Sequence, residues 1–195
     1  SSVMKILKYE GFVAAPFTPM DERYEVNYGI IPEYYHFLEK NGVIGAFING
    51  STGEGPSLTH REKQLQAEAW SVCLKNRGRV RIINLVGGTS YGECVENAVM
   101  SNELGLSAIA VVAPYYYKPA SADDLADFVV RIGESVPGMP VYFYHIPSLT
   151  GVSIPMATFI AKISRILPNF AGIKYTNEDL MDFMQCLDFE GGKYD

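Results

Sequence analysis

The chain has 195 residues, of which 48% are hydrophobic and 19% charged, a composition typical of one globular domain with a sizeable core. Its 16 basic and 22 acidic residues give a formal net charge of -6, whereas nucleic-acid-binding domains usually carry a basic surface. The longest hydrophobic stretch, residues 108–114, falls short of the roughly 18 residues that a membrane-spanning helix needs. We therefore expect neither nucleic acid nor a membrane as a partner.

Short hydrophobic runs that suit buried strands alternate along the chain with longer segments of helical periodicity. In chain order, the predicted strands are 11–17, 45–49, 80–86, 108–113, 141–145 and 172–175. Each strand is followed by a predicted helix, at 27–40, 61–74, 91–104, 123–135, 155–166 and 177–187 respectively. The strands are hydrophobic throughout, which is typical of parallel sheets covered by helices on their faces. The pattern predicts a parallel α/β fold in a single domain over residues 1–195.

Four of the predicted helices begin with a hydroxyl residue three positions before an acidic residue, as in a capping box. The four hydroxyl residues are Thr59, Ser90, Ser121 and Thr176.

Polar residues gather where the predicted strands end, and their distribution favours one of two α/β architectures. In a doubly wound open sheet only the strands at a switch point contribute to a site, whereas a (β/α)8 barrel builds its site from the loops after many strands. Here at least four strand ends carry polar groups, so we expect a (β/α)8 TIM barrel. Only about six βα units are present, so we expect the catalytic barrel domain to be truncated before its last two strands, and the open edges to make it marginally stable alone.

Lys174 is the strongest chemical signal, because it lies inside the hydrophobic strand 172–175. Side chains alternate along a strand, so Lys174 shares a face with Gly172 and lies opposite Ile173. We expect it to point into the barrel, where burial lowers the pKa of an amine and makes it a nucleophile. The alternative is a lysine that extends from the strand end into solvent.

Tyr144 ends the preceding strand and is a candidate proton relay for such an amine, although packing in the core is the simpler interpretation. The segment 50–55, Gly-Ser-Thr-Gly-Glu-Gly, offers two hydroxyls among glycines, which suits a carboxylate or phosphate. It lacks the spacing of a nucleotide-binding loop. An ordinary turn is its alternative interpretation.

The three cysteines and three histidines are scattered, without the spacing of a disulfide-rich protein or a zinc site. We therefore expect no metal site. The first residues lack the hydrophobic segment of a secretory signal, so we expect a cytoplasmic protein.

Three segments resemble the signatures of the N-acetylneuraminate lyase and dihydrodipicolinate synthase superfamily of class I aldolases. They are Gly-Ser-Thr-Gly-Glu at 50–54, Tyr-His-Ile-Pro-Ser-Leu-Thr-Gly at 144–151 and Gly-Ile-Lys-Tyr-Thr at 172–176. The resemblance implies that Lys174 forms a Schiff base with pyruvate and that Tyr144 donates and accepts protons. Because the iminium ion is itself an electron sink, we expect no cofactor. The resemblance further implies carboxylate binding by Ser51 and Thr52, sugar contact by Thr176, and a homotetramer in which Tyr115 or Tyr116 reaches a neighbouring subunit.

The segment after Tyr144 bears on the substrate. Dihydrodipicolinate synthases usually have Asn and Arg where this chain has His145 and Leu149, and the missing guanidinium removes a bidentate carboxylate contact. The segment is similar to that of sialic acid lyases, so we expect cleavage of N-acetylneuraminate to N-acetylmannosamine and pyruvate. A keto-deoxy sugar acid aldolase or dihydrodipicolinate synthase is the alternative, and so is a noncatalytic fragment that binds the pyruvyl group.

Overall fold

The computed structural model describes residues 12–14, 18–50, 58–87, 90–114, 118–146 and 154–175. The chain divides into two compact units. The N-terminal unit contains Tyr9–Leu85 and Val99–Ile109, and the C-terminal unit contains Val86–Ala98 and the residues from Ala110 onward.

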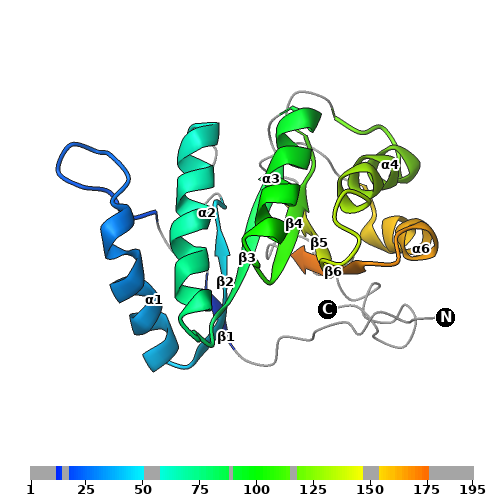
Figure 1. The fold of residues 1–195 in the computed structure, drawn as a ribbon. Helices are drawn as coiled ribbons and strands as arrows, with labels where there is room; N and C mark the ends of the chain where they lie inside the picture. Colours follow the sequence, from blue (N-terminus) through cyan, green and yellow to red (C-terminus); the bar gives the residue numbers. More distant parts are fainter. Residues whose placement is uncertain are drawn as a thin grey trace. The chain divides into compact units, whose positions relative to one another are not determined.

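The N-terminal unit contains strand β1 (Phe12–Ala14), a short 3-10 helix η1 (Tyr28–Ile30), helix α1 (Ile31–Lys40), strand β2 (Val43–Ile48) and helix α2 (His60–Lys75). Most of strand β3 (Arg81–Gly87) also belongs to it. Strands β1, β2 and β3 are parallel neighbours. Helices α1 and α2 contact one another and lie side by side in Figure 1.

Helix α1 begins four residues later than the periodicity predicts, after the η1 turn. Pro32 explains the difference, because proline has no amide hydrogen and fits only the first turn of an α-helix. A helix starting at residue 27 would place Pro32 in its interior. The structure instead places Pro32 in the first turn.

The core of the N-terminal unit lies between its strands and helices α1 and α2. Trp70 of α2 is 1% exposed, and its ring lies 5.9 Å from the ring of Tyr34 and 6.1 Å from that of Tyr35. The Tyr35 hydroxyl donates a hydrogen bond of 2.7 Å to the carbonyl of Val80, just before β3. Helix α1 is thereby joined to both α2 and the sheet.

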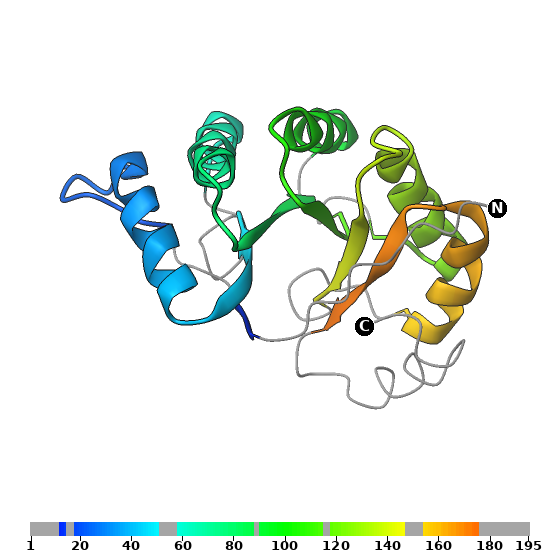
Figure 2. The same ribbon diagram turned by 60° about the horizontal axis from the view of Figure 1, so that its bottom comes forward.

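The C-terminal unit contains helix α4 (Ala122–Gly133), strand β5 (Val141–His145), helix α6 (Met156–Ile166) and strand β6 (Phe170–Tyr175). Helix α3 (Tyr91–Glu103) and strand β4 (Ala108–Val112) contribute residues to both units, as β3 does. Helices α4 and α6 pack against one another, and Figure 2 shows both on the same side of β5 and β6.

Aromatic rings fill the space between α6 and the strands of the C-terminal unit. Phe159 of α6 lies 5.0 Å from Phe143 of β5 and 5.8 Å from Phe170 of β6, measured between ring centroids. Asn169, which precedes β6, donates from Nδ2 to the carbonyls of Gly133, Val136 and Met139. These bonds join the start of β6 to the connection between α4 and β5.

The strands follow one another in the sheet in chain order, β1-β2-β3-β4-β5-β6. A doubly wound sheet reverses its strand order at a switch point, whereas a barrel adds each strand next to the one before it. Strands β4 and β5 are buried at every position, as the hydrophobic runs predicted for a sheet covered on both faces. The observed order is that of the (β/α)8 barrel.

Within the described residues, the predicted elements lie close to the observed ones, whereas the predicted helix 177–187 lies outside them. Thr59 forms a complete capping box with Glu62, and the Ser90 and Ser121 hydroxyls accept from the amides of Glu93 and Asp124. The predicted cap at Thr176 lies outside the described residues. Strand β2 begins two residues before its predicted start, and β6 begins at Phe170 rather than Gly172.

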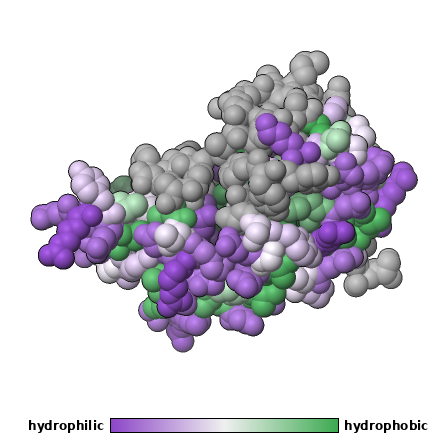
Figure 3. Space-filling view, turned by 90° about the horizontal axis from the view of Figure 1, so that it is seen from above, coloured by the Kyte–Doolittle hydropathy of each residue, from purple (hydrophilic) through white to green (hydrophobic). Residues whose placement is uncertain are grey.

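Exposed large hydrophobic side chains are spread over several elements among the described residues. Figure 3 shows one face of the molecule, on which hydrophobic residues are interspersed with hydrophilic ones. No helix among the described residues has the length and hydrophobicity to cross a membrane.

Candidate active site

Strands β5 and β6 place the two strongest candidate residues next to each other. The strands are parallel neighbours, and Tyr144 is paired with Lys174. Paired residues of neighbouring strands point to the same face of a sheet. The Nζ atom of Lys174 lies 4.3 Å from the centroid of the Tyr144 ring. The predicted association of the amine with the phenol side chain is thus present in the structure.

This face of the sheet is the one turned away from α6. Phe143 and Phe170 both contact Phe159 of α6, so they mark the face toward the helices. Tyr144 neighbours Phe143 in the strand, and side chains alternate, so Tyr144 and its partner Lys174 lie on the opposite face. In a (β/α)8 barrel the helices cover the outside, and the face away from them is the interior.

Burial makes the amine of Lys174 less basic. Desolvation lowers the pKa of Lys174 from its ordinary value of 10.5 to about 8. The face of a tyrosine ring attracts an ammonium group and so opposes this fall, but burial is the larger effect. At pH 7 about a tenth of such an amine is neutral, compared with about three in ten thousand at a pKa of 10.5. A neutral amine is the form that attacks a carbonyl.

Tyr144 is 9% exposed, and Tyr142, two residues earlier on the same face, is 7% exposed. Two buried tyrosines therefore line this face of β5 next to β6. Tyr142 was not among the predicted site residues, although its position two residues before Tyr144 in the same strand was a signal for it.

His145 lies on the other face of β5. Its ring centroid is 6.2 Å from that of Phe143, and the side chain is 3% exposed. The ring therefore belongs to the layer between sheet and helices, away from Lys174. His145 is one of the two positions at which the sequence was expected to differ from the synthases. Its side chain lies on the face of the sheet opposite the amine.

Several predicted site residues lie outside the described residues, so their positions stay predictions. They are Ser51, Thr52, Tyr115, Tyr116 and Thr176, together with Leu149.

A network of buried polar side chains includes Asn49, just before the predicted carboxylate-binding segment in the sequence, and it was not among the predicted features. Asn49 follows β2 with a φ of 61°, and its Nδ2 donates to Asn84 Oδ1 at 2.8 Å and to the Lys63 carbonyl at 3.2 Å. Asn84 Nδ2 donates in turn to Ser101 Oγ at 2.9 Å. This hydrogen-bond network joins the end of β2 to α2, β3 and α3. Asparagine adopts this left-handed conformation more often than most residues. An asparagine directly before a glycine at the end of a predicted strand was therefore the sequence signal for this turn.

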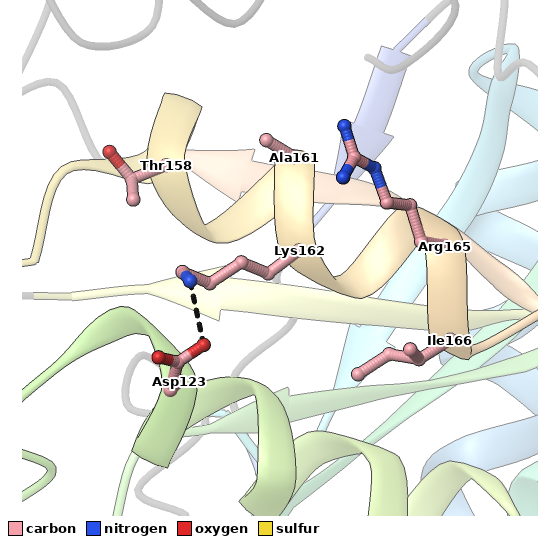
Figure 4. Close-up of a pocket in the computed structure, with 6 residues that line it drawn as sticks. All are labelled: Asp123, Thr158, Ala161, Lys162, Arg165 and Ile166. Carbon is pink, nitrogen blue, oxygen red and sulfur yellow. Dashed lines mark ion pairs between the residues drawn. The ribbon is translucent and has the colours of Figure 1, made fainter.

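A surface pocket lies elsewhere, between the outer sides of α4 and α6, and its lining residues include Thr158, Lys162 and Arg165. Figure 4 shows Lys162 reaching toward Asp123 of α4, with 2.7 Å between Nζ and Oδ1, whereas Arg165 points away from that pair. Both partners of the ion pair are exposed, so it contributes little to stability. The pocket lies on the helices and contains neither Lys174 nor Tyr144.

No cluster of three histidine, cysteine or acidic side chains suited to a metal ion occurs among the described residues.

An amine of lowered pKa on the inner face of consecutive parallel strands defines a candidate Schiff-base site in a barrel fold. Comparisons with known proteins show the family and the fold. Residues 8–189 match the model of the Dihydrodipicolinate synthetase family. The chain therefore belongs to that family.

Both lyases and synthases are among the similar proteins. An N-acetylneuraminate lyase from Sus scrofa is 40% identical over 183 residues, which make up 93% of this chain and 57% of the relative. The structure of Proteus mirabilis N-acetylneuraminate lyase matches with a TM-score of 0.91 and 34% identity, over 97% of this chain and 63% of that one. A dihydrodipicolinate synthase from Aquifex aeolicus matches with a TM-score of 0.85 and 27% identity, over 96% and 62%. The chain thus spans about 60% of the length of these relatives, and its fold is a partial (β/α)8 barrel.

Proposed function

We propose that this chain carries the Schiff-base centre of a class I aldolase that cleaves N-acetylneuraminate to N-acetylmannosamine and pyruvate. The observation that carries the proposal is the partly buried amine of Lys174, of lowered pKa, 4.3 Å from the centre of the Tyr144 ring.

In the proposed reaction the neutral Nζ of Lys174 attacks the C2 ketone of the open-chain sugar acid. The Tyr144 phenol donates its proton to the carbinolamine hydroxyl, which leaves as water. The resulting iminium ion accepts the electron pair of the breaking C3–C4 bond, and the phenolate of Tyr144 is ready to take up a proton. Tyr144 takes the proton from the C4 hydroxyl, so C4 becomes the aldehyde of N-acetylmannosamine. Tyr144 then passes this proton to C3 of the remaining enamine. Hydrolysis of the iminium ion by water releases pyruvate and restores both the amine and the phenol. This chemistry draws on the amine, the phenol and water.

The preference for a sialic acid rests on the comparisons and on the sequence. The lyase relatives are more similar to this chain than the synthase from Aquifex aeolicus, at 40% and 34% identity against 27%. Leu149 stands where the synthases have an arginine that would bind a second carboxylate. The homotetramer implied by the resemblance and the expected cytoplasmic location are also proposals, which size-exclusion chromatography and cell fractionation would test.

Borohydride reduction in the presence of pyruvate, followed by peptide mass mapping, tests the centre of the proposal. We expect the label on Lys174 and its loss in Lys174→Met. Lys162→Met is the matched control, because Lys162 is an exposed lysine of the same unit. Labelling of other lysines with none at Lys174 would refute the proposed Schiff base.

Substrate choice needs a separate measurement. Cleavage of N-acetylneuraminate and condensation of pyruvate with aspartate semialdehyde are compared in the same preparation, and faster condensation would favour the synthase. Labelling of Lys174 without turnover of either substrate would instead support the noncatalytic pyruvyl-binding fragment.

A further inference from the structure

The side chains at the two ends of strand β6 do not point to the faces that a regular strand would give them. Phe170 pairs with Val141 and lies 5.8 Å from Phe159, on the face toward α6. Lys174 is four residues later, and in a regular strand residues i and i+4 share one face. Yet Lys174 pairs with Tyr144 on the opposite face. Something between Phe170 and Lys174 must reverse the alternation.

A shift of one residue in the strand pairing accounts for the reversal. Val141 pairs with Phe170, but the next residue of β5, Tyr142, pairs with Gly172, so Ala171 has no counterpart. An extra residue of this kind is a β-bulge, and it changes which face every later side chain occupies. Without it Tyr144 would be opposite Ile173, and Lys174 would point into the aromatic layer beneath α6.

Gly172 has the backbone conformation that the bulge requires. Its φ is 151°, a value that residues with a side chain rarely adopt. A β-branched residue is particularly unsuited to it. Ala171 and Gly172 are both buried, and Gly172 is paired with the buried Tyr142, so surrounding atoms on both faces hold the bulge in place.

We propose that the Ala171–Gly172 bulge is a positioning element, with Gly172 as the positioning residue that turns Lys174 toward Tyr144. This proposal rests on the proposed Schiff-base function. It goes further by assigning the orientation of the amine to a specific backbone feature two residues away from it.

Gly172→Val tests the proposal, because valine disfavours the backbone conformation at the bulge. The measured quantities are the rate of borohydride trapping with pyruvate and the pH midpoint of trapping. Misplacement of a reacting group by about 1 Å costs on the order of 10²-fold in rate. We expect trapping at Lys174 to fall by at least about tenfold, with a displaced pH midpoint.

The matched control is Gly42→Val. Gly42 also has a positive φ, 75°, and no atom lies within 4 Å of where its Cβ would be. It precedes β2 in the other unit, so valine there strains the backbone without touching the bulge. We expect Gly42→Val to lower the urea midpoint while trapping and its pH midpoint stay unchanged.

Deletion of Ala171 in the Gly172→Val variant provides a rescue test. The deletion leaves Phe170 and Lys174 three positions apart, so a regular strand places them on opposite faces without a bulge. Valine then has an ordinary strand conformation, and we expect most of the trapping rate to return. A merely destabilising role for Gly172 would not predict recovery on removal of a second buried residue.

The proposal is overturned if Gly172→Val traps pyruvate within twofold of the unmodified chain, or loses no more activity than Gly42→Val. It is also overturned if the Ala171 deletion fails to restore trapping while the protein remains folded by urea denaturation. If the unmodified chain itself is not labelled at Lys174, the proposed function fails. In that case the rate of acetylation of Lys174, mapped without pyruvate, still compares its position in the variants, and an unchanged rate in Gly172→Val overturns the bulge proposal.

Discussion

Replacement of Lys174 with methionine is expected to stabilise the folded chain at neutral pH while it removes the reactive amine. Methionine fills a similar volume without a charge, so the variant isolates the cost of burying the ammonium group. Desolvation lowers the pKa of Lys174 from 10.5 to about 8, and each pKa unit corresponds to about 1.4 kcal/mol. The whole fall corresponds to about 3 kcal/mol, and partial exposure of the side chain reduces this to about 2 kcal/mol.

The sign of the pH dependence follows from proton binding. Below pH 8 both the folded and the unfolded chain hold the proton, so the folded state carries the full cost of the buried charge. Between about pH 8 and 10.5 only the unfolded amine stays protonated, so the unfolded state binds more protons and stability rises with pH. The advantage of Lys174→Met is therefore greatest at pH 7 and shrinks toward pH 10.

Urea denaturation at pH 7, 8, 9 and 10 measures the free energy of unfolding of both proteins. Lys162→Met is the control, because the exposed pair of Lys162 with Asp123 should give a small difference that does not vary over this range. A difference between the unmodified chain and Lys174→Met that stays constant from pH 7 to 10 would show that Lys174 is not buried as described.

Three further changes probe Tyr144 and two buried hydrogen-bonded residues of the N-terminal unit. Tyr144→Phe should slow exchange of the pyruvate methyl protons in D2O by about 10² to 10⁴, far more than it slows imine trapping, since the phenol moves protons at C3; equal exchange rates by NMR would reduce it to a packing residue. Tyr35→Phe should lower the free energy of unfolding by about 1 kcal/mol at pH 7 through the lost hydrogen bond. Burial raises the pKa of Tyr35 to about 12, so stability that depends on its neutral form is lost as the pH rises from 10 to 12, and the variant should lack this loss in an alkaline denaturation series. Asn84→Ala should destabilise by about 2 kcal/mol, because the amide of Asn49 and the hydroxyl of Ser101 lose their buried partner; a thermal midpoint within 1 °C of the unmodified chain would contradict it.

The order and type of the elements were predictable because they depend on local patterns. Hydrophobic runs, helical periodicity and capping residues involve neighbours a few positions apart, and the helix caps at Thr59, Ser90 and Ser121 show how closely such signals fix a boundary. The same locality explains the error at α1, where the cost of Pro32 in a helix interior was not weighed.

The sequence by itself also determined that Lys174 and Ile173 occupy opposite faces of a strand, and motif resemblance named Tyr144 as its partner. Alternation is a property of the extended backbone and needs no knowledge of the fold. The sequence could not determine which face was the inner one, because that depends on where the helices pack.

Only the tertiary structure decided how that amine is placed and tuned. The pairing of Tyr144 with Lys174 and the extra residue at Ala171 involve residues about 30 positions apart, which local patterns do not relate. The pKa of Lys174 depends on burial by every element around it. The packing of His145 and the hydrogen-bond network of Asn49, Asn84 and Ser101 also depend on the tertiary structure. In each case the strands and helices involved meet only in the folded protein.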